Sequence, residues 1–206
     1  MDTSLQRYLD EEILPRYERF DTAHRRTHAE AVIGESRRLA ALFGAREELA
    51  CVAAAYHDLG LEAGRERHHL RSGELLRADR RLRDWFTEEE IETMAAAAED
   101  HRASAERAPR TLYGRIVAEA DRTIDPETIL RRTVQYGAAH MPELDRAGQY
   151  ARFTEHLRRK YGEGGYLRLW LPDPAKQRRL EELRTMMRDE ELLRRRFDAL
   201  YEAERP

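Results

Sequence analysis

The chain has 206 residues, of which 41% are hydrophobic and 37% are charged, and 37 basic against 40 acidic residues leave a formal net charge of −3. This balance argues against a general polyanion-binding surface, so stable nucleic-acid binding is not expected. A single cysteine, Cys51, excludes an internal disulfide and a cysteine-based zinc site. The longest apolar run, residues 49–56, is far shorter than the roughly 20 residues that span a bilayer. With no signal-like start, we expect a cytoplasmic protein without a membrane partner.

Alanine, leucine, arginine and glutamate dominate the chain, and this composition predicts an all-α fold. The first expected segment is an amphipathic helix over residues 3–18, which Pro15 bends or ends early. The second helix runs to Phe43 and ends at Gly44. Its start lies near Thr22 or Thr27, and the capping-box pattern of Thr27 with Glu30 favours the later one.

The third helix, residues 46–58, is apolar around most of its circumference, which is typical of a central buried helix. Shorter helical patterns follow at residues 70–76, 91–101 and 112–124. Thr87 and Glu90 form a second capping-box pattern before the middle one of these. Pro126 then starts a further helix.

The last third of the chain predicts two longer helices, residues 145–160 and 174–201, with a glycine-rich turn at 162–165 between them. An apolar stripe on the final helix is explained either by packing within the chain or by a homodimer face; it consists of Leu183, Met186, Leu193 and Phe197. We therefore expect a helical bundle with its N-terminal helix over residues 1–125 and a helical extension over 126–206 that packs on it.

Several polar side chains lie where apolar helix faces predict the interior. His28, His101 and Asp121 each continue the apolar stripe of a separate helix. The adjacent pair His57 and Asp58 ends the most buried helix, whose carboxyl end favours a cation. Buried imidazole and carboxylate groups are costly unless they are paired or bind a metal. The four helices together therefore predict a metal site.

Imidazole and carboxylate ligands suit one or two divalent transition metal ions, with Mn, Fe, Ni, Co and Zn as candidates. One ion would be held by four residues: His28, His57, Asp58 and Asp121. His69 and His101 add ligands for a second ion, with Asp58 bridging the two.

The same residues carry a resemblance to a known family. The chain resembles the HD-domain metal-dependent phosphohydrolase superfamily from about residue 21 to 125, in the segments HAEAV, AAAYHDLGL, HHLRSG, EDHRAS and VAEADR. The resemblance implies an HD-domain helical bundle and assigns the ligand roles given above. His69 is preferred to His68 because subgroups with two metals commonly have a glycine four residues later, here Gly73. Arg102 follows His101, and no GYP tripeptide is present, so the chain departs from the HD-GYP subgroup and cyclic di-GMP hydrolysis is not favoured.

The resemblance implies hydrolysis of a phosphate ester or nucleotide by a metal-activated water, with Asp58 as the catalytic residue. Arginine forks suit phosphate oxygens. The candidate substrate-binding residues near the ligands are Arg67, Arg102, Arg122 and His24.

Two other functions remain open at this point. The same set of four histidines and two aspartates resembles that of HD-type mixed-valent diiron oxygenases, which need iron and consume oxygen. A non-catalytic helical module with a structural metal would instead fill every metal position with protein ligands. We favour hydrolysis because it is the commoner activity in the superfamily.

Overall fold

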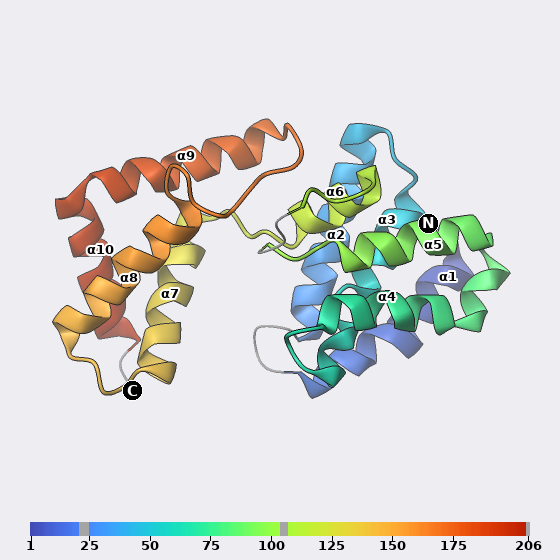
Figure 1. The fold of residues 1–206 in the computed structure, drawn as a ribbon, viewed down its shortest axis with the longest axis horizontal. Helices are drawn as coiled ribbons and strands as arrows, with labels where there is room; N and C mark the ends of the chain where they lie inside the picture. The colour runs from blue at the N-terminus through green and yellow to red at the C-terminus, as the bar shows by residue number, and fades with distance from the viewer. Residues whose placement is uncertain (21–24, 104–106, 205–206) are drawn as a thin grey trace. The chain divides into compact units, whose positions relative to one another are not determined.

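The computed structural model describes residues 1–20, 25–103 and 107–204, and within these ranges the chain forms ten α-helices and no β-strand (Figure 1). The predicted all-α class is confirmed. The chain divides into two compact units, Met1–Arg122 and Thr123–Pro206. No helix in the described ranges combines the length and the apolar character that crossing a membrane requires.

The N-terminal segment is helical but changes its helix type twice. Helix α1 (Thr3–Tyr8) continues into a π-helical turn over Leu9–Ile13 and then a 3-10 helix over Leu14–Arg19. Pro15 explains the last change, because proline has no backbone N–H and its ring clashes with the preceding turn of an α-helix. The predicted interruption at this proline is confirmed.

Helix α2 (Arg26–Phe43) ends as predicted at Gly44, whose φ of 66° is a left-handed conformation that suits glycine. Its predicted start is wrong. The N-cap is Arg25 and Thr27 already lies inside the first turn, so the capping box does not form. Instead, the Arg26 Nε donates a hydrogen bond to a Glu30 carboxylate oxygen at 2.8 Å. This i, i+4 ion pair occupies the side chain that the capping box required.

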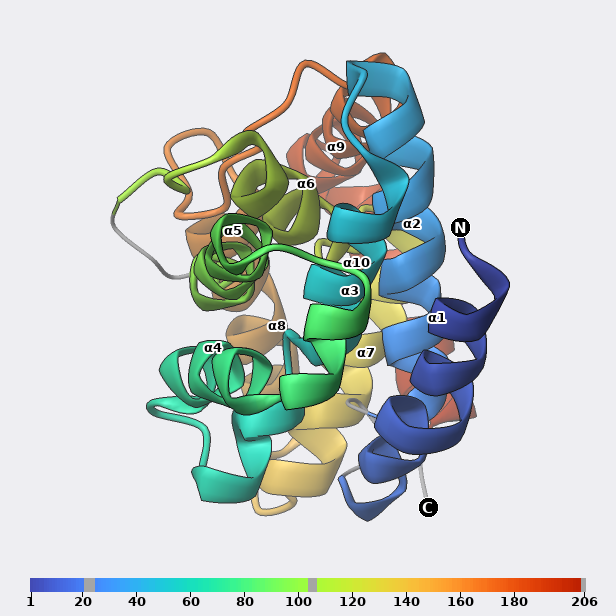
Figure 2. The same cartoon turned by 90° about the vertical axis from the view of Figure 1, so that its right-hand side faces the viewer.

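Helix α3 (Glu47–Tyr56) is the centre of the first unit. Every residue from Leu49 to Tyr56 is buried, as the apolar pattern predicted. It packs against α2, α5 (Glu88–Glu99) and α6 (Leu112–Ala120), and Figure 2 shows it among these neighbours. Residues 53–55 of this helix are three consecutive alanines, whose small side chains let the surrounding helices approach closely.

A short 3-10 helix (Leu59–Ala63) leads from α3 toward α4 (His68–Ala78), and a second one (Arg80–Asp84) follows α4. The predicted capping box of α5 is confirmed, since Thr87 and Glu90 exchange side-chain and backbone hydrogen bonds. The carboxylate of Asp79 accepts hydrogen bonds from the hydroxyls of Tyr8 and Tyr56. This contact ties α1 and α3 to the end of α4.

The second unit is built from α7 (Pro126–His140), α8 (Arg146–Tyr161), α9 (Pro174–Arg188) and α10 (Glu190–Ala203). The expected single final helix is wrong, because it breaks at Asp189, which has an extended conformation and caps α10 by accepting from the Leu192 N–H at 2.9 Å. The unit has its own apolar core, whose most deeply buried members include Leu130, Phe153, Leu157, Leu183 and Phe197. Leu183, Leu193 and Phe197 of the apolar stripe are thus buried by packing within the chain.

Candidate metal centre

The His57–Asp58 pair sits immediately after α3, where the buried tyrosine Tyr17 fixes the backbone. The Tyr17 hydroxyl donates to the carbonyl oxygen of Ala55 at 2.9 Å and accepts from the Asp58 N–H at 3.3 Å. Burial, followed by the negative charge of Asp58, raises the pKa of Tyr17 well above its usual range, so the hydroxyl remains a donor. Tyr17 is thus a positioning residue that the sequence did not predict. The signal that could have found it is a tyrosine on the apolar side of the N-terminal segment.

A first group of donor atoms brings together α2, the end of α3 and the end of α6. The His28 Nε2 lies 3.2 Å from an oxygen of Asp121 and 3.3 Å from the Nε2 of His57. The His57 Nε2 lies 3.3 Å from the Oδ2 of Asp58 and 3.8 Å from Asp121. The four residues that the sequence assigned to one ion therefore meet at one place.

A second group of donor atoms gathers on the other oxygen of Asp58. Its Oδ1 lies 3.4 Å from the Nε2 of His68 and 3.4 Å from the Nε2 of His101. The two histidine nitrogens are 3.1 Å apart. Asp58 thus presents one carboxylate oxygen to each group, which is the arrangement of a bridging ligand.

The backbone orients three of the four imidazoles in the same way. The Nδ1 atoms of His57, His68 and His101 lie 2.7, 2.7 and 2.6 Å from the carbonyl oxygens three residues earlier, those of Ala54, Arg65 and Ala98. A carbonyl only accepts, so each Nδ1 carries the hydrogen and each Nε2 keeps its lone pair in the neutral ring. Metal-ligating histidines are commonly held by such a bond on their other nitrogen.

The electrostatics of the cluster call for a positive charge at its centre. Burial alone acts to lower the pKa of His57, but the carboxylates of Asp58 and Asp121 raise it to about 9. Burial likewise acts to raise the pKa of Asp58, yet the adjacent imidazoles of His57 and His101 hold it well below its usual range. Desolvation also acts to raise the pKa of Asp121, but the hydrogen bond to His28 and the charge of His57 lower it. The buried Asp58 and the partly exposed Asp121 therefore stay charged, and a bound cation would compensate them.

The donor spacing fits metal coordination. Ligands at about 2.1 Å from one ion are separated by about 3.0 Å in octahedral and about 3.4 Å in tetrahedral geometry. The shorter distances in both groups, 3.1–3.4 Å, fall at these values. Among the described residues the second group has three protein donors, which leaves a position for water or substrate. The side chains of His28, His68 and Asp121 are 16, 13 and 24% exposed, so solvent reaches the cluster.

The choice of His69 over His68 needs correction. The structure places His68, the first residue of α4, in the second group, while the next residue is turned away by the helical rotation. The Nδ1 of His69 is buried without a hydrogen-bond partner among the described residues, and burial followed by the charge of Arg102 lowers its pKa to about 4. Gly73 has a different role, since a Cβ there would lie 2.5 Å from a carboxylate oxygen of Glu99 in α5.

The candidate substrate-binding residues fall into different environments. Arg102 is half-buried beside His101 and donates from Nη1 to the carbonyl oxygen of Glu66 at 2.9 Å. Arg67 is exposed at the start of α4. Arg122 is buried and donates to the carbonyl oxygen of Ala118, and the burial lowers its pKa. Its guanidinium therefore lies in the interior and is not exposed to a substrate. His24 lies outside the described residues.

The comparisons with known proteins identify the family of the first unit. Residues 25–124 match the family model of the HD domain, and this range contains every residue of the two donor groups. No curated protein and no solved structure matches the chain. HD domains bind divalent metals and are for the most part metal-dependent hydrolases, in agreement with the clustered histidines and aspartates. Residues 25–124 therefore form an HD domain, and through them the chain belongs to the HD-domain superfamily.

Proposed function

We propose that the chain is a metal-dependent phosphohydrolase that binds two divalent metal ions and cleaves a phosphate ester or nucleotide. One observation carries the proposal: the two carboxylate oxygens of Asp58 face separate donor groups, at 3.3 Å from His57 and 3.4 Å from both His68 and His101. Two ions that share a carboxylate can activate water and stabilise both the attacking and the leaving oxygen.

The protein side chains have distinct tasks in this mechanism. The first ion would be held by His28, His57, Asp58 and Asp121, and the second by Asp58, His68 and His101. When bound, the ions supply Lewis acidity and lower the pKa of a water molecule. The Asp58 carboxylate, charged at neutral pH, accepts a hydrogen bond from the attacking water and orients it toward phosphorus.

Arg102 is the arginine best placed to bind the substrate phosphate. It follows His101 directly, and only its Nη1 is engaged by the Glu66 carbonyl among the contacts described. Its remaining N–H groups suit the oxygens of a phosphate. The exposed Arg67 is a second candidate, and His24 stays a prediction from the sequence. We expect the Arg102→Ala variant to raise the KM for a phosphate ester more than it lowers kcat.

The proposal is tested by hydrolysis of p-nitrophenyl phosphate and a panel of nucleoside monophosphates. The full chain is stripped of metal, reloaded with Mn²⁺, and assayed in air and without oxygen. We expect turnover that needs metal and does not need oxygen. Removal of a residue that only supports a metal ligand typically lowers activity by about 10–100-fold. Asp58→Ala removes a ligand of both groups, so its turnover should fall by more than this.

A matched variant makes this test specific. Asp84→Ala removes an exposed aspartate at the end of a 3-10 helix and should leave turnover unchanged. Metal-replete Asp58→Ala protein with full activity would contradict the proposal. Turnover only with iron and oxygen would favour the diiron oxygenase instead, and bound metal without any turnover would favour the non-catalytic module.

A further inference from the structure

The second unit contains a cavity of about 310 Å³ between α7, α8 and the segment after α8, and no residue of the metal centre is among its lining residues. Its lining combines aromatic and basic side chains, chiefly Tyr136, Arg152, His156, Arg159 and Tyr166. A volume of this order suits a small molecule.

The cavity wall on α7 is held in place by specific contacts. The guanidinium of Arg152 donates to the carbonyl oxygen of Thr133 and lies 5.9 Å from the ring centre of Tyr136. A Cβ on Gly137 would lie 2.5 Å from the Nη2 of Arg152, so the glycine gives the guanidinium room against α7. The ring of His140 stacks on Tyr136, with centres 4.1 Å apart and an interplanar angle of 12°. The arginine and the aromatic wall are therefore positioned together.

The wall formed by Tyr166 is fixed through the backbone. The Tyr166 N–H donates to the Arg159 carbonyl oxygen at 3.0 Å, and the Leu167 N–H donates to the Lys160 carbonyl at the same distance. These bonds return the chain to the end of α8 after the glycine-rich turn. As whole residues, Tyr136 and Tyr166 nevertheless stay 53 and 45% exposed. Two tyrosines thus keep aromatic surface available at the cavity.

The cavity has an excess of positive charge. None of the described carboxylates forms an ion pair with Arg152 or Arg159. The one acidic residue of the lining, Glu155, pairs with the exposed Arg158 at 2.9 Å. Desolvation, followed by the charges of Lys160, Arg152 and Arg159, lowers the pKa of His156, so this histidine is neutral when the cavity is empty.

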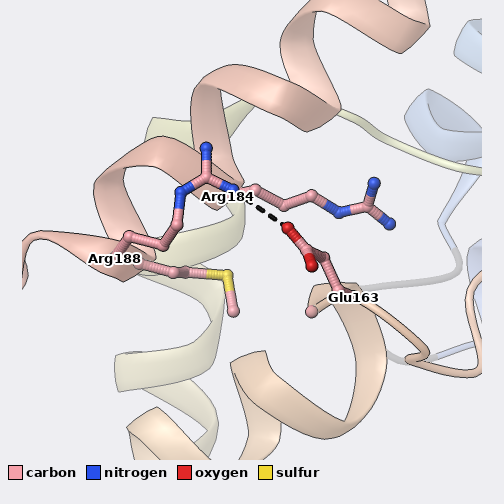
Figure 3. A pocket seen from close by; sticks show the side chains of 5 residues that line it. Glu163, Arg184 and Arg188 are labelled. Carbon is pink, nitrogen blue, oxygen red and sulfur yellow. Dashed lines mark hydrogen bonds and ion pairs between the residues drawn. The ribbon is translucent and has the colours of Figure 1, made fainter.

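In a second hollow of the same unit, by contrast, acidic side chains pair with an arginine of the lining (Figure 3). There Arg188 pairs with Glu163 at 3.2 Å and with Glu181 at 2.6 Å. The neighbouring Arg184 donates from Nε to the carbonyl oxygen of Tyr161 at 2.9 Å. The charge of Arg188 is therefore already compensated in that hollow, whereas Arg152 and Arg159 form no ion pair with any carboxylate in the described part of the chain.

We propose that the cavity between α7 and α8 binds a small aromatic phosphate of mononucleotide type, with Arg152 and Arg159 on the phosphate and the tyrosines against the ring. Arginine guanidinium groups match phosphate oxygens in geometry and charge. An aromatic ring stacks on tyrosine whatever its substituents, so the site discriminates by ring and charge rather than by a base-specific pattern. The lining of the site contains no residue of the metal centre, and binding there requires no turnover.

The test is calorimetric titration of the metal-free full chain, dialysed free of chelator, with AMP, adenosine and inorganic phosphate. AMP should bind at least about tenfold more tightly than either fragment, because only AMP engages both arginines and aromatic rings. The Arg159→Ala variant should weaken AMP binding by about tenfold or more. The Arg195→Ala variant is the control, since Arg195 is an exposed arginine of α10 that pairs with Glu191 and lies outside the cavity lining, and it should bind AMP within about twofold of the unaltered chain.

A second readout assigns the binding to this cavity. The imidazole proton signals of His140 and His156 should shift on AMP addition, and the signal of His57 should not. Equal AMP affinity in the Arg195 and Arg159 variants would overturn the proposal. Phosphate that binds as tightly as AMP would also overturn it, because the tyrosines would then contribute nothing. Since metal and turnover are absent from the titration, its result is independent of the hydrolase test.

Discussion

The side chain of Asp58 lies within 3.8 Å of four imidazole nitrogens, those of His28, His57, His68 and His101. A neutral histidine whose hydrogen lies on Nδ1 has no hydrogen on Nε2 to donate to a carboxylate. Four imidazoles surround this carboxylate, and three of them, His57, His68 and His101, have Nδ1 bonded to the backbone. The Nε2 atoms of these three are therefore oriented for cations rather than for one another.

At the residue scale, the two neighbouring histidines at the start of α4 allow a direct comparison. We expect His68→Ala to bind one metal ion per chain instead of two and to lose at least about a hundredfold in phosphate-ester turnover. His69→Ala should keep both ions, because the His69 ring lies outside both donor groups. Elemental mass spectrometry measures the number of metal ions per chain in both variants. Loss of an ion from the His69 variant alone would show that the assignment from the structure is wrong.

The lone cysteine gives a second prediction at this scale. Burial raises the pKa of Cys51 from 9.0 to about 11. Only the thiolate reacts with iodoacetamide, so at pH 8 the folded chain should react about a hundredfold more slowly than the denatured chain from this shift alone. The rate should rise about tenfold per pH unit up to about pH 11. Mass spectrometry of the alkylated chain measures it, and fast labelling of the folded chain at pH 8 would contradict the burial of α3.

Most of the side chains that the sequence predicted as ligands lie together in the structure, but the helical register at the start of α4 and the supporting residue Tyr17 were not predicted. Five of the six proposed ligands, His28, His57, Asp58, His101 and Asp121, meet in the structure. The sixth differs by one position, because a shift of one residue in the start of α4 changes which of two adjacent histidines faces the cluster. Tyr17 was missed because its contact with Asp58 joins segments 41 residues apart.

At the scale of elements, the contact between the 3-10 helix after α3 and the start of α4 sets the position of His68. The Gly60 N–H donates to the hydroxyl of Ser72 at 2.9 Å. A Cβ on Gly60 would lie 2.0 Å from the His68 carbonyl oxygen and 2.6 Å from the Ser72 nitrogen. Both are backbone atoms, so only a glycine lets the two elements approach this closely.

We therefore expect Gly60→Ala to destabilise the chain by about 1–3 kcal/mol, because α4 must move away to make room for the methyl group. The same movement should weaken binding of the second metal ion. The control is Gly34→Ala in α2, where a Cβ meets nothing within 4 Å and the change should stabilise the helix by about 0.5–1 kcal/mol. Urea unfolding measures both variants. Equal stability of the two would contradict this packing.

Helices were easier to predict than their exact ends. Thr87 and Glu90 form the predicted capping box, whereas Thr27 and Glu30 show the same pattern but Glu30 bonds Arg26 instead. The difference arises because Arg26 competes for the Glu30 carboxylate, and the capping-box pattern does not take such a neighbouring basic residue into account. The break at Asp189 was missed because the charged residues on both sides have high helix propensity. An aspartate that can cap the following turn is the signal that could have found it.

At the scale of the whole molecule, each unit has its own buried core, and the two proposed sites lie in different units. All ligands of the proposed metal centre belong to the unit that ends at Arg122. The apolar core of the other unit, which contains Phe153 and Phe197, includes none of them. The extent of the HD-domain match, residues 25–124, agrees with this division of roles.

Metal binding should therefore stabilise the two units unequally. Ligand binding to the folded state adds stability where the binding groups are. We expect saturating Mn²⁺ to slow amide hydrogen exchange in α2–α6 and to leave α8–α10 unchanged in the full chain. Hydrogen–deuterium exchange followed by peptide mass spectrometry resolves the two units. Equal protection of both, or protection of the second unit alone, would contradict the location of the metal centre.

The most direct test of the proposed metal centre is a crystal structure of the Mn²⁺-loaded chain with anomalous diffraction data collected at the manganese absorption edge. We expect two anomalous peaks about 3.5–4 Å apart. One should lie among His28, His57, Asp58 and Asp121, and the other among Asp58, His68 and His101. A single peak, or a second ion held by His69 in place of His68, would contradict the bridging role of Asp58 or the assignment of the second donor group.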